Sequence, residues 1–310
     1  MMMLQSLASY AMRGPLQAIL AVVGLAVASL LFFPLSWPLG YLGAGVVALV
    51  ALTQASRESL LIVFGATAAL ALLGMGVGSP HYGLGYALSV WLPAWLAAQW
   101  LRQHQSLSQT LGLAGLAGLI GIGLMFLLLG DPAQWWSAYF DQRLIPELKE
   151  AGVEFPDEAA FRTLLQQVAG VMTGALLATL VLSAVIGVLI GRYWQAGLFE
   201  VGSPHEFHQL RLGTLAAGIG LVILALAQFV GGLAGQWLVN AATVVLTVFL
   251  FQGLAIGHQL AGRTRNGQPW VVALYILLLF TLPYGAIAIA MLGILDNWID
   301  IRRRIPGAAS

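Results

Sequence analysis

Polar side chains inside the apolar stretches are the first residues to consider for chemistry. A polar group in the hydrocarbon of a bilayer costs free energy unless it is partnered, so such a residue suggests a function. Three amide side chains of this kind, Gln228, Asn240 and Gln252, lie in the C-terminal half of the chain. Amides in this setting either cross-link helices or bind a polar ligand, and both interpretations stay open.

An acidic, aromatic segment at residues 130–167 is the second candidate. It contains Trp135 and Trp136, and its large apolar side chains recur at three- and four-residue spacings between residues 133 and 150. This pattern predicts an amphipathic helix at the membrane interface, with its aromatic rings at headgroup depth. We expect the segment either to cap the surface or to gate a ligand site, with both tryptophans among the ligand-binding residues.

Residue patterns typical of catalysis are missing from the sequence. His205 and His208 are three residues apart, whereas a helical zinc-protease motif needs two histidines four apart. The chain has no cysteine, no phosphate-binding loop ending in Lys-Ser or Lys-Thr, and no Gly-x-Ser-x-Gly turn. We therefore expect no enzyme activity, no metal and no cofactor. The net charge of +1 gives no indication of a nucleic-acid partner.

Small residues recur along two of the apolar segments. Spacings of three or four place such residues on one helix face, where a neighbouring helix can approach closely. The residues concerned are Gly24 and Ala28 in the first segment and Gly112, Gly115, Gly118 and Gly121 in the fifth. They serve either packing within the chain or docking of a separate membrane protein.

The composition requires that these residues be positioned by membrane helices. Of the 310 residues, 60% are hydrophobic and only 8% are charged, which is more apolar surface than a soluble domain of this length can bury. Stretches near the ~20 residues needed to cross a bilayer predict an all-α, polytopic bundle. The predicted segments are 15–33, 38–54, 59–78, 84–102, 109–129, 168–191, 212–231, 235–258 and 269–298. Pro283 should break the last one, because proline removes a backbone donor.

Arginine placement predicts the orientation. Arginines fall in alternate gaps between the segments, so the N-terminus is expected in the cytoplasm and the acidic gap 130–167 outside. This gives a five-helix region at 1–129, an external loop at 130–167 and a C-terminal region at 168–310, with an interfacial cytoplasmic linker near 192–211. Nine crossings would place the C-terminus outside, yet residues 302–304 are three arginines. A hairpin at Pro283 with a cytoplasmic tail is the favoured solution.

Four stretches carry a resemblance to a known family. They are Arg192–Gln195, Glu206–Arg211, Phe251–His258 and Gly293–Arg302, with the sequences RYWQ, EFHQLR, FQGLAIGH and GILDNWIDIR. They resemble the YybS-like family of bacterial membrane proteins, a domain of unknown function, over nearly the whole chain. The resemblance implies a bacterial inner-membrane location and no catalytic residues.

The front half also looks like the membrane-embedded substrate-binding subunits of energy-coupling-factor importers. That resemblance implies about six helices, a cytoplasmic N-terminus and a docking face for a coupling subunit with its ATPases, which Gly24 and Ala28 would supply. The helices beyond residue 211 depart from that pattern. Small rod-shape scaffold proteins of the envelope are a further comparison. We therefore expect a small-molecule-binding transport subunit, with a scaffold that assembles envelope proteins as the alternative.

Overall fold

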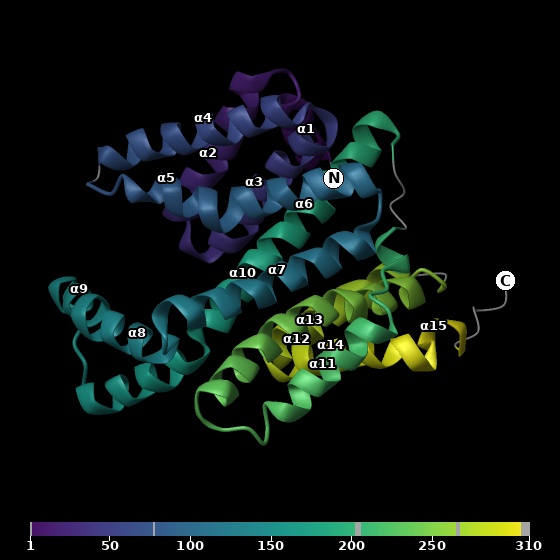
Figure 1. Cartoon of the computed structure of the whole chain (residues 1–310). Coiled ribbons are helices and arrows are strands. Elements are labelled where there is room, and N and C mark those ends of the chain that lie inside the picture. The colour runs from purple at the N-terminus through teal and green to yellow at the C-terminus, as the bar shows by residue number, and fades with distance from the viewer. Residues whose placement is uncertain (1, 77, 202–205, 265–266, 305–310) are drawn as a thin grey trace. The chain divides into compact units, whose positions relative to one another are not determined.

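The structure, a computed structural model, describes residues 2–76, 78–201, 206–264 and 267–304 (Figure 1). Within these ranges the chain is helical and contains no strand, which confirms the predicted all-α class. Every predicted apolar segment contains a helix. The main helices are α1 Met2–Ala11, α2 Pro15–Leu31, α3 Ser36–Thr53, α4 Ser56–Met75, α5 His81–Tyr86, α6 Leu92–His104, α7 Leu107–Leu129, α8 Pro132–Tyr139, α9 Ile145–Glu150, α10 Glu158–Phe199, α11 Thr214–Leu226, α12 Gly232–Ala261, α13 Gly267–Thr281, α14 Tyr284–Ile299 and α15 Ile301–Arg304.

Five of the described helices are long and apolar enough to cross a membrane: α3, α4, α7, α10 and α12. The helices α2, α11, α13 and α14 are apolar but shorter, at 10–17 residues. The longest, α10, has 42 residues, or about 63 Å of helix, and therefore exceeds a hydrocarbon core of ~30 Å. These lengths support a membrane protein with several crossings, and the count of nine stays a prediction.

Prolines shape three places in the fold. The break predicted in the last segment is confirmed, because α13 ends at Thr281 and α14 begins at Tyr284, on either side of Pro283. Two π-helical turns, Ala87–Trp91 and Phe140–Leu144, each end two residues before a proline, Pro93 and Pro146. A proline gives no N–H to the carbonyl four residues earlier, and the wider turn accommodates that loss.

The chain forms two compact units. Unit 1 comprises Met1–Ala114 and Thr179–Arg211, and unit 2 comprises Gly115–Ala178 and Leu212–Ser310. Both α7 and α10 contribute to each unit. The units therefore combine segments that are distant in sequence, whereas the predicted regions 1–129, 130–167 and 168–310 follow the chain in order.

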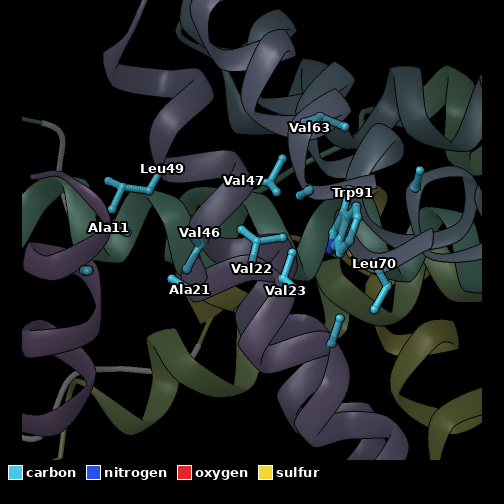
Figure 2. Packing of buried hydrophobic residues seen from close by; sticks show 14 of the residues in the cluster. Ala11, Ala21, Val22, Val23, Val46, Val47, Leu49, Val63, Leu70 and Trp91 are labelled. Atoms are coloured by element: carbon cyan, nitrogen blue, oxygen red, sulfur yellow. The ribbon is translucent and has the colours of Figure 1, made fainter. Parts of the chain in front are cut away.

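Small and β-branched side chains fill the core of unit 1. Figure 2 shows Val22, Val46, Leu49 and Trp91 packed together from α2, α3 and the π-helical turn that precedes α6. The C-terminal half of α10 packs on the same core, since a Cβ on Gly191 would lie 2.8 Å from the Ala48 side chain. Close approach of this kind is typical of helices that pack through small residues.

The helix α12 is central to unit 2. It packs against α11, α13 and α14, and much of its surface is buried. At its crossing with α14 the two backbones touch: a Cβ on Gly253 would collide with the carbonyl oxygen of Ile289, and one on Gly293 with that of Phe249. Glycine is required at both positions, because any side chain would force the helices apart.

Candidate functional site

The five predicted ligand-binding residues all belong to unit 2, but they do not converge. Gln228 is exposed in the turn that follows α11, and Trp135 is exposed on α8. Asn240 and Gln252 are buried at separate places on α12, and Trp136 is half-buried on α8. Trp136 and Asn240 bond adjacent residues of α10, Thr173 and Gly174, but the other three lie elsewhere, so the five do not surround one ligand.

Asn240 cross-links two helices. Its Nδ2 donates to the carbonyl oxygen of Gly170 on α10 at 2.8 Å, and its Oδ1 accepts from the backbone N–H of Gly174. Gly174 allows this contact, because a Cβ there would lie 2.8 Å from the Asn240 Cα. Of the two interpretations of this amide, the cross-link is the one that the geometry supports.

The segment around the two tryptophans is helical over α8, the second π-helical turn and α9. Trp136 faces α10, where its indole N–H donates to the Thr173 hydroxyl at 3.0 Å. Phe140, four residues later, is buried. Trp135 instead stacks on Tyr139, and both rings are exposed. The aromatic side chains thus divide between an inner and an outer face, and their depth in a membrane stays a prediction.

Exposed ion pairs join α9 to the start of α10. Lys149 and Arg162 both bond the Glu158 carboxylate, at 2.8 Å each, and Arg162 also pairs with Asp141. These hydrogen bonds hold the pKa of the Glu158 carboxyl below its ordinary value. The group lies at the first residue of α10, before its apolar stretch. Such pairs orient the loop but contribute little stability in water.

Gln252 and Asn297 satisfy the start of α11. The Oε1 of Gln252 accepts from the N–H of Leu212, and the Oδ1 of Asn297 accepts from the N–H of Gly213, both at 3.0 Å. Leu212 and Gly213 precede the first residue of α11, so their N–H groups have no partner within the helix, and apolar surroundings make an unmet donor costly. Two side-chain amides from α12 and α14 supply the missing acceptors.

A buried ion pair lies next to Asn297 in the sequence, between Asp296 on α14 and Arg302 on α15. The carboxylate of Asp296, at 0% exposure, lies 3.1 Å from the Nε of Arg302. Arg302, six residues later, is itself largely buried. Arg303 pairs with Asp300 instead.

Three of the four predicted glycines of α7, Gly115, Gly118 and Gly121, belong to unit 2, and Gly112 belongs to unit 1. A Cβ on Gly115 would lie 2.8 Å from Val248, one on Gly121 would lie 2.6 Å from Leu177, and Gly118 is buried. Gly112 and Ala28 are half-buried. Gly24 differs, because nothing lies within 4 Å of the position its Cβ would take. Of the predicted docking residues, Gly24 has its small-residue face open.

Unit 1 holds a polar network at one end, here named the Ser59 network. Its members are Ser56, Ser59, Trp95, Gln99 and Arg102, from α4 and α6. The Ser59 hydroxyl accepts from the indole N–H of Trp95 at 3.0 Å and from the amide of Gln99 at 3.1 Å. Ser56 donates to Gln99 at 2.8 Å and accepts from Arg102 at 2.6 Å. The buried polar atoms of these side chains thus satisfy one another.

A second group of residues, here named the Trp91 cluster, borders the core of unit 1. Its members are Ser29 on α2, Gly40 and Gly43 on α3, Tyr86 on α5 and Trp91 in the π-helical turn. The hydroxyls of Ser29 and Tyr86 are hydrogen-bonded to each other, and the rings of Tyr86 and Trp91 are 5.5 Å apart. Arg102 of the Ser59 network also donates to the carbonyl oxygen of Gln54, the residue that follows α3. Gln54 is eleven residues from Gly43, so the two groups are about 16 Å apart along α3.

The indole N–H of Trp91 has no hydrogen-bond partner among the described residues, although the side chain is 0% exposed. Trp95, one turn later in the same helical segment, has its N–H bonded in the Ser59 network. Buried tryptophan N–H groups usually find an acceptor, and an unmet one costs about 1–3 kcal/mol. A Cβ on Gly43 would lie 3.7 Å from this nitrogen, so the indole packs beside a glycine of α3.

Sequence reasoning did not find the Trp91 cluster. Its members are common residue types spread over three predicted segments, and Trp91 alone resembles an ordinary core residue. One available signal was Pro93, because a proline inside a predicted span marks a local disturbance of the helix. π-Helical turns of this kind are frequent at functional sites.

Of the two histidines considered above as a metal motif, His205 lies outside the described residues. Within the described part of the chain, no three His, Asp or Glu side chains gather as a metal site would require. Comparison of the chain with known protein families, curated proteins and solved structures gave no match.

Proposed function

We propose that this chain is a non-catalytic protein of the bacterial inner membrane that binds a small molecule at the Trp91 cluster. The observation that carries the proposal is the buried indole N–H of Trp91, which has no acceptor in a well-packed unit. A bound molecule with a carbonyl or ring nitrogen would supply that acceptor. The resemblance of the front half to importer substrate-binding subunits supports the same function.

The residues of the cluster define what they would bind. Trp91 offers a hydrogen-bond donor, the paired hydroxyls of Ser29 and Tyr86 offer both donor and acceptor capacity, and two aromatic rings offer stacking surface. None of the five side chains is charged. The part of the molecule that enters the cluster is therefore uncharged and carries a hydrogen-bond acceptor.

In this proposal the chain captures the molecule and does not transform it. Energy for transport would come from a coupling subunit with ATPases, because the sequence contains no phosphate-binding loop of its own. With the N-terminus in the cytoplasm, the C-terminal end of α2, and with it Ser29, would lie toward the outer face. A molecule arriving from outside would meet this end of unit 1 first.

The test is purification of the tagged chain from its native host in a gentle detergent, followed by mass spectrometry of the extracted small molecules. We expect a near-stoichiometric metabolite with the wild-type chain and with Trp95→Phe, which removes a hydrogen bond of the Ser59 network and no hydrogen-bonding group of the Trp91 cluster. The amount of metabolite that co-purifies with Trp91→Phe should be at least ten-fold lower. Equal retention by Trp91→Phe, or no metabolite with the wild-type chain, would overturn the proposal.

The open face at Gly24 favours a second candidate function, a scaffold that docks other membrane proteins. Exposed leucines, Leu16 and Leu20, precede Gly24 at four-residue spacing on α2, and Gly24 makes a notch in that face. The matched test is Gly24→Leu against Leu20→Ala, with co-purifying proteins quantified. A scaffold requires that Gly24→Leu release an envelope protein while the chain itself stays folded.

A further inference from the structure

The last predicted segment is folded back on itself along α12. A Cβ on Gly257 would lie 2.6 Å from the side chain of Leu274 on α13, and Gly253 touches Ile289 on α14. Leu274 and Ile289 are fifteen residues apart, about 22 Å in a straight helix, whereas Gly253 and Gly257 are about 6 Å apart. α13 and α14 therefore form a hairpin whose two arms lie beside the same turn of α12.

Both ends of the hairpin lie at one end of α12. Gly267, the first residue of α13, touches the backbone of Ala261, the last residue of α12. Near the end of α14, Asn297 bonds the N–H of Gly213 at the start of α11, and α15 packs against α12. The ion pair of Asp296 with Arg302 holds the exit from α14 in place.

The arms are too short to cross a bilayer and return. α13 has 15 residues and α14 has 16, which give about 22 and 24 Å against a hydrocarbon core of ~30 Å. The turn at Leu282 is eight residues beyond Leu274, about 12 Å, and so reaches roughly the level of Phe249. α12 begins seventeen residues before Phe249, about 25 Å further along its axis.

The surface of the hairpin is apolar on its free sides. No charged residue occurs between Gly267 and Leu295, and α13 has no buried residue. Phe280 and Tyr284, on either side of the turn, are 82% and 79% exposed. So much apolar surface is unfavourable in water and favourable among acyl chains.

We infer that α13 and α14 form a re-entrant hairpin, which enters the bilayer from the side where α12 ends, turns within the hydrocarbon and leaves on the same side. Its surface partner is the acyl chains of that region of the membrane. The inference explains why three arginines follow a predicted ninth crossing, because residues 302–304 then lie on the same side as the start of α11. It stands independently of the proposed ligand site.

Side-specific cysteine labelling tests the topology directly, since the chain has no cysteine of its own. Single variants Gln209→Cys, Arg304→Cys, Leu282→Cys and Glu154→Cys would be exposed to a membrane-impermeant maleimide in intact spheroplasts and in inverted vesicles. We expect positions 209 and 304 to react on one side, 154 on the other and 282 on neither. Reaction of 304 on the side of 154, or of 282 from either side, would overturn the inference.

A spin label at Phe280→Cys then identifies what surrounds the hairpin in reconstituted membranes. If acyl chains surround the hairpin, oxygen should relax the spin label strongly and a water-soluble nickel chelate should relax it weakly. Weak relaxation by both reagents would mean that protein covers the hairpin, and strong relaxation by nickel would mean water; either result contradicts a lipid partner. A monodisperse profile in detergent serves as the check that each variant is folded.

Discussion

Two tryptophans one turn apart show how a single hydrogen bond separates a structural residue from a candidate binding residue. Trp95 donates to Ser59 within a network whose members satisfy one another. Trp91 is fully buried and its N–H has no partner among the described residues. Trp95 is half-buried, so the two side chains differ in burial as well as in hydrogen bonding, and we expect different responses to substitution.

In the ligand-free chain, Trp91→Phe should leave thermal stability nearly unchanged, because the loss of an unpaired buried donor offsets the cavity that the smaller ring leaves in the core. Ser59→Ala should lower the free energy of unfolding by about 1–3 kcal/mol, because it leaves the buried donors of Trp95 and Gln99 without their acceptor. The measurement is the unfolding midpoint of each purified variant in one detergent. An equal loss for both variants would show that Trp91 is a packing residue.

The buried pair of Asp296 and Arg302 gives a second prediction at this scale. Asp296→Leu and Arg302→Leu should each destabilise the chain by about 3–5 kcal/mol, since each leaves an unpaired charge in an apolar place. The double variant should recover most of that loss, because no charge remains. A double-mutant cycle measures this, and additive losses would show that the two charges are not coupled.

At the scale of elements, the apolar runs and the proline predicted the helices well, because a helix in hydrocarbon needs only length and few charges. The predicted segments 109–129 and 235–258 match α7 and the central part of α12. The π-helical turns were not predicted. Their position depends on how a lost hydrogen bond is redistributed, which the residue pattern does not specify.

Glycines of similar appearance in the sequence differ sharply in their surroundings. Gly293→Ala should disrupt the crossing of α12 and α14, because its Cβ would collide with the Phe249 carbonyl oxygen. Gly24→Ala should be neutral or stabilise α2 by up to about 1 kcal/mol, because alanine favours helix and the position is open. Unfolding midpoints compare the two, and tolerance of Gly293→Ala would contradict the close crossing.

At the scale of the whole molecule, the sequence could not predict the two units. Segmentation along the chain divides it at loops, whereas α7 and α10 each run through both units. Which part of a long apolar helix packs on which partner depends on side-chain shape along its faces. Gly187 and Gly191 touch α3, while Gly174 touches α12.

The candidate site illustrates the same limit. Polarity within apolar segments pointed to Asn240, which joins α12 to α10, and to Gln252, whose Oε1 bonds the backbone before α11 while its buried Nε2 has no partner among the described residues. The Trp91 cluster depends on an absent partner, and a missing hydrogen bond has no signature in a sequence. Of the three amides that residue type singled out, two are buried and Gln228 is exposed, and only the fold shows which polar groups remain unsatisfied.

The most direct test of the ligand site is the dissociation constant of the co-purified molecule, measured by calorimetry for the wild-type chain, Trp91→Phe and Trp95→Phe. Loss of one buried hydrogen bond predicts at least ten-fold weaker binding by Trp91→Phe, and affinity within two-fold of wild type for Trp95→Phe. Unchanged affinity in Trp91→Phe would contradict a binding site at this cluster.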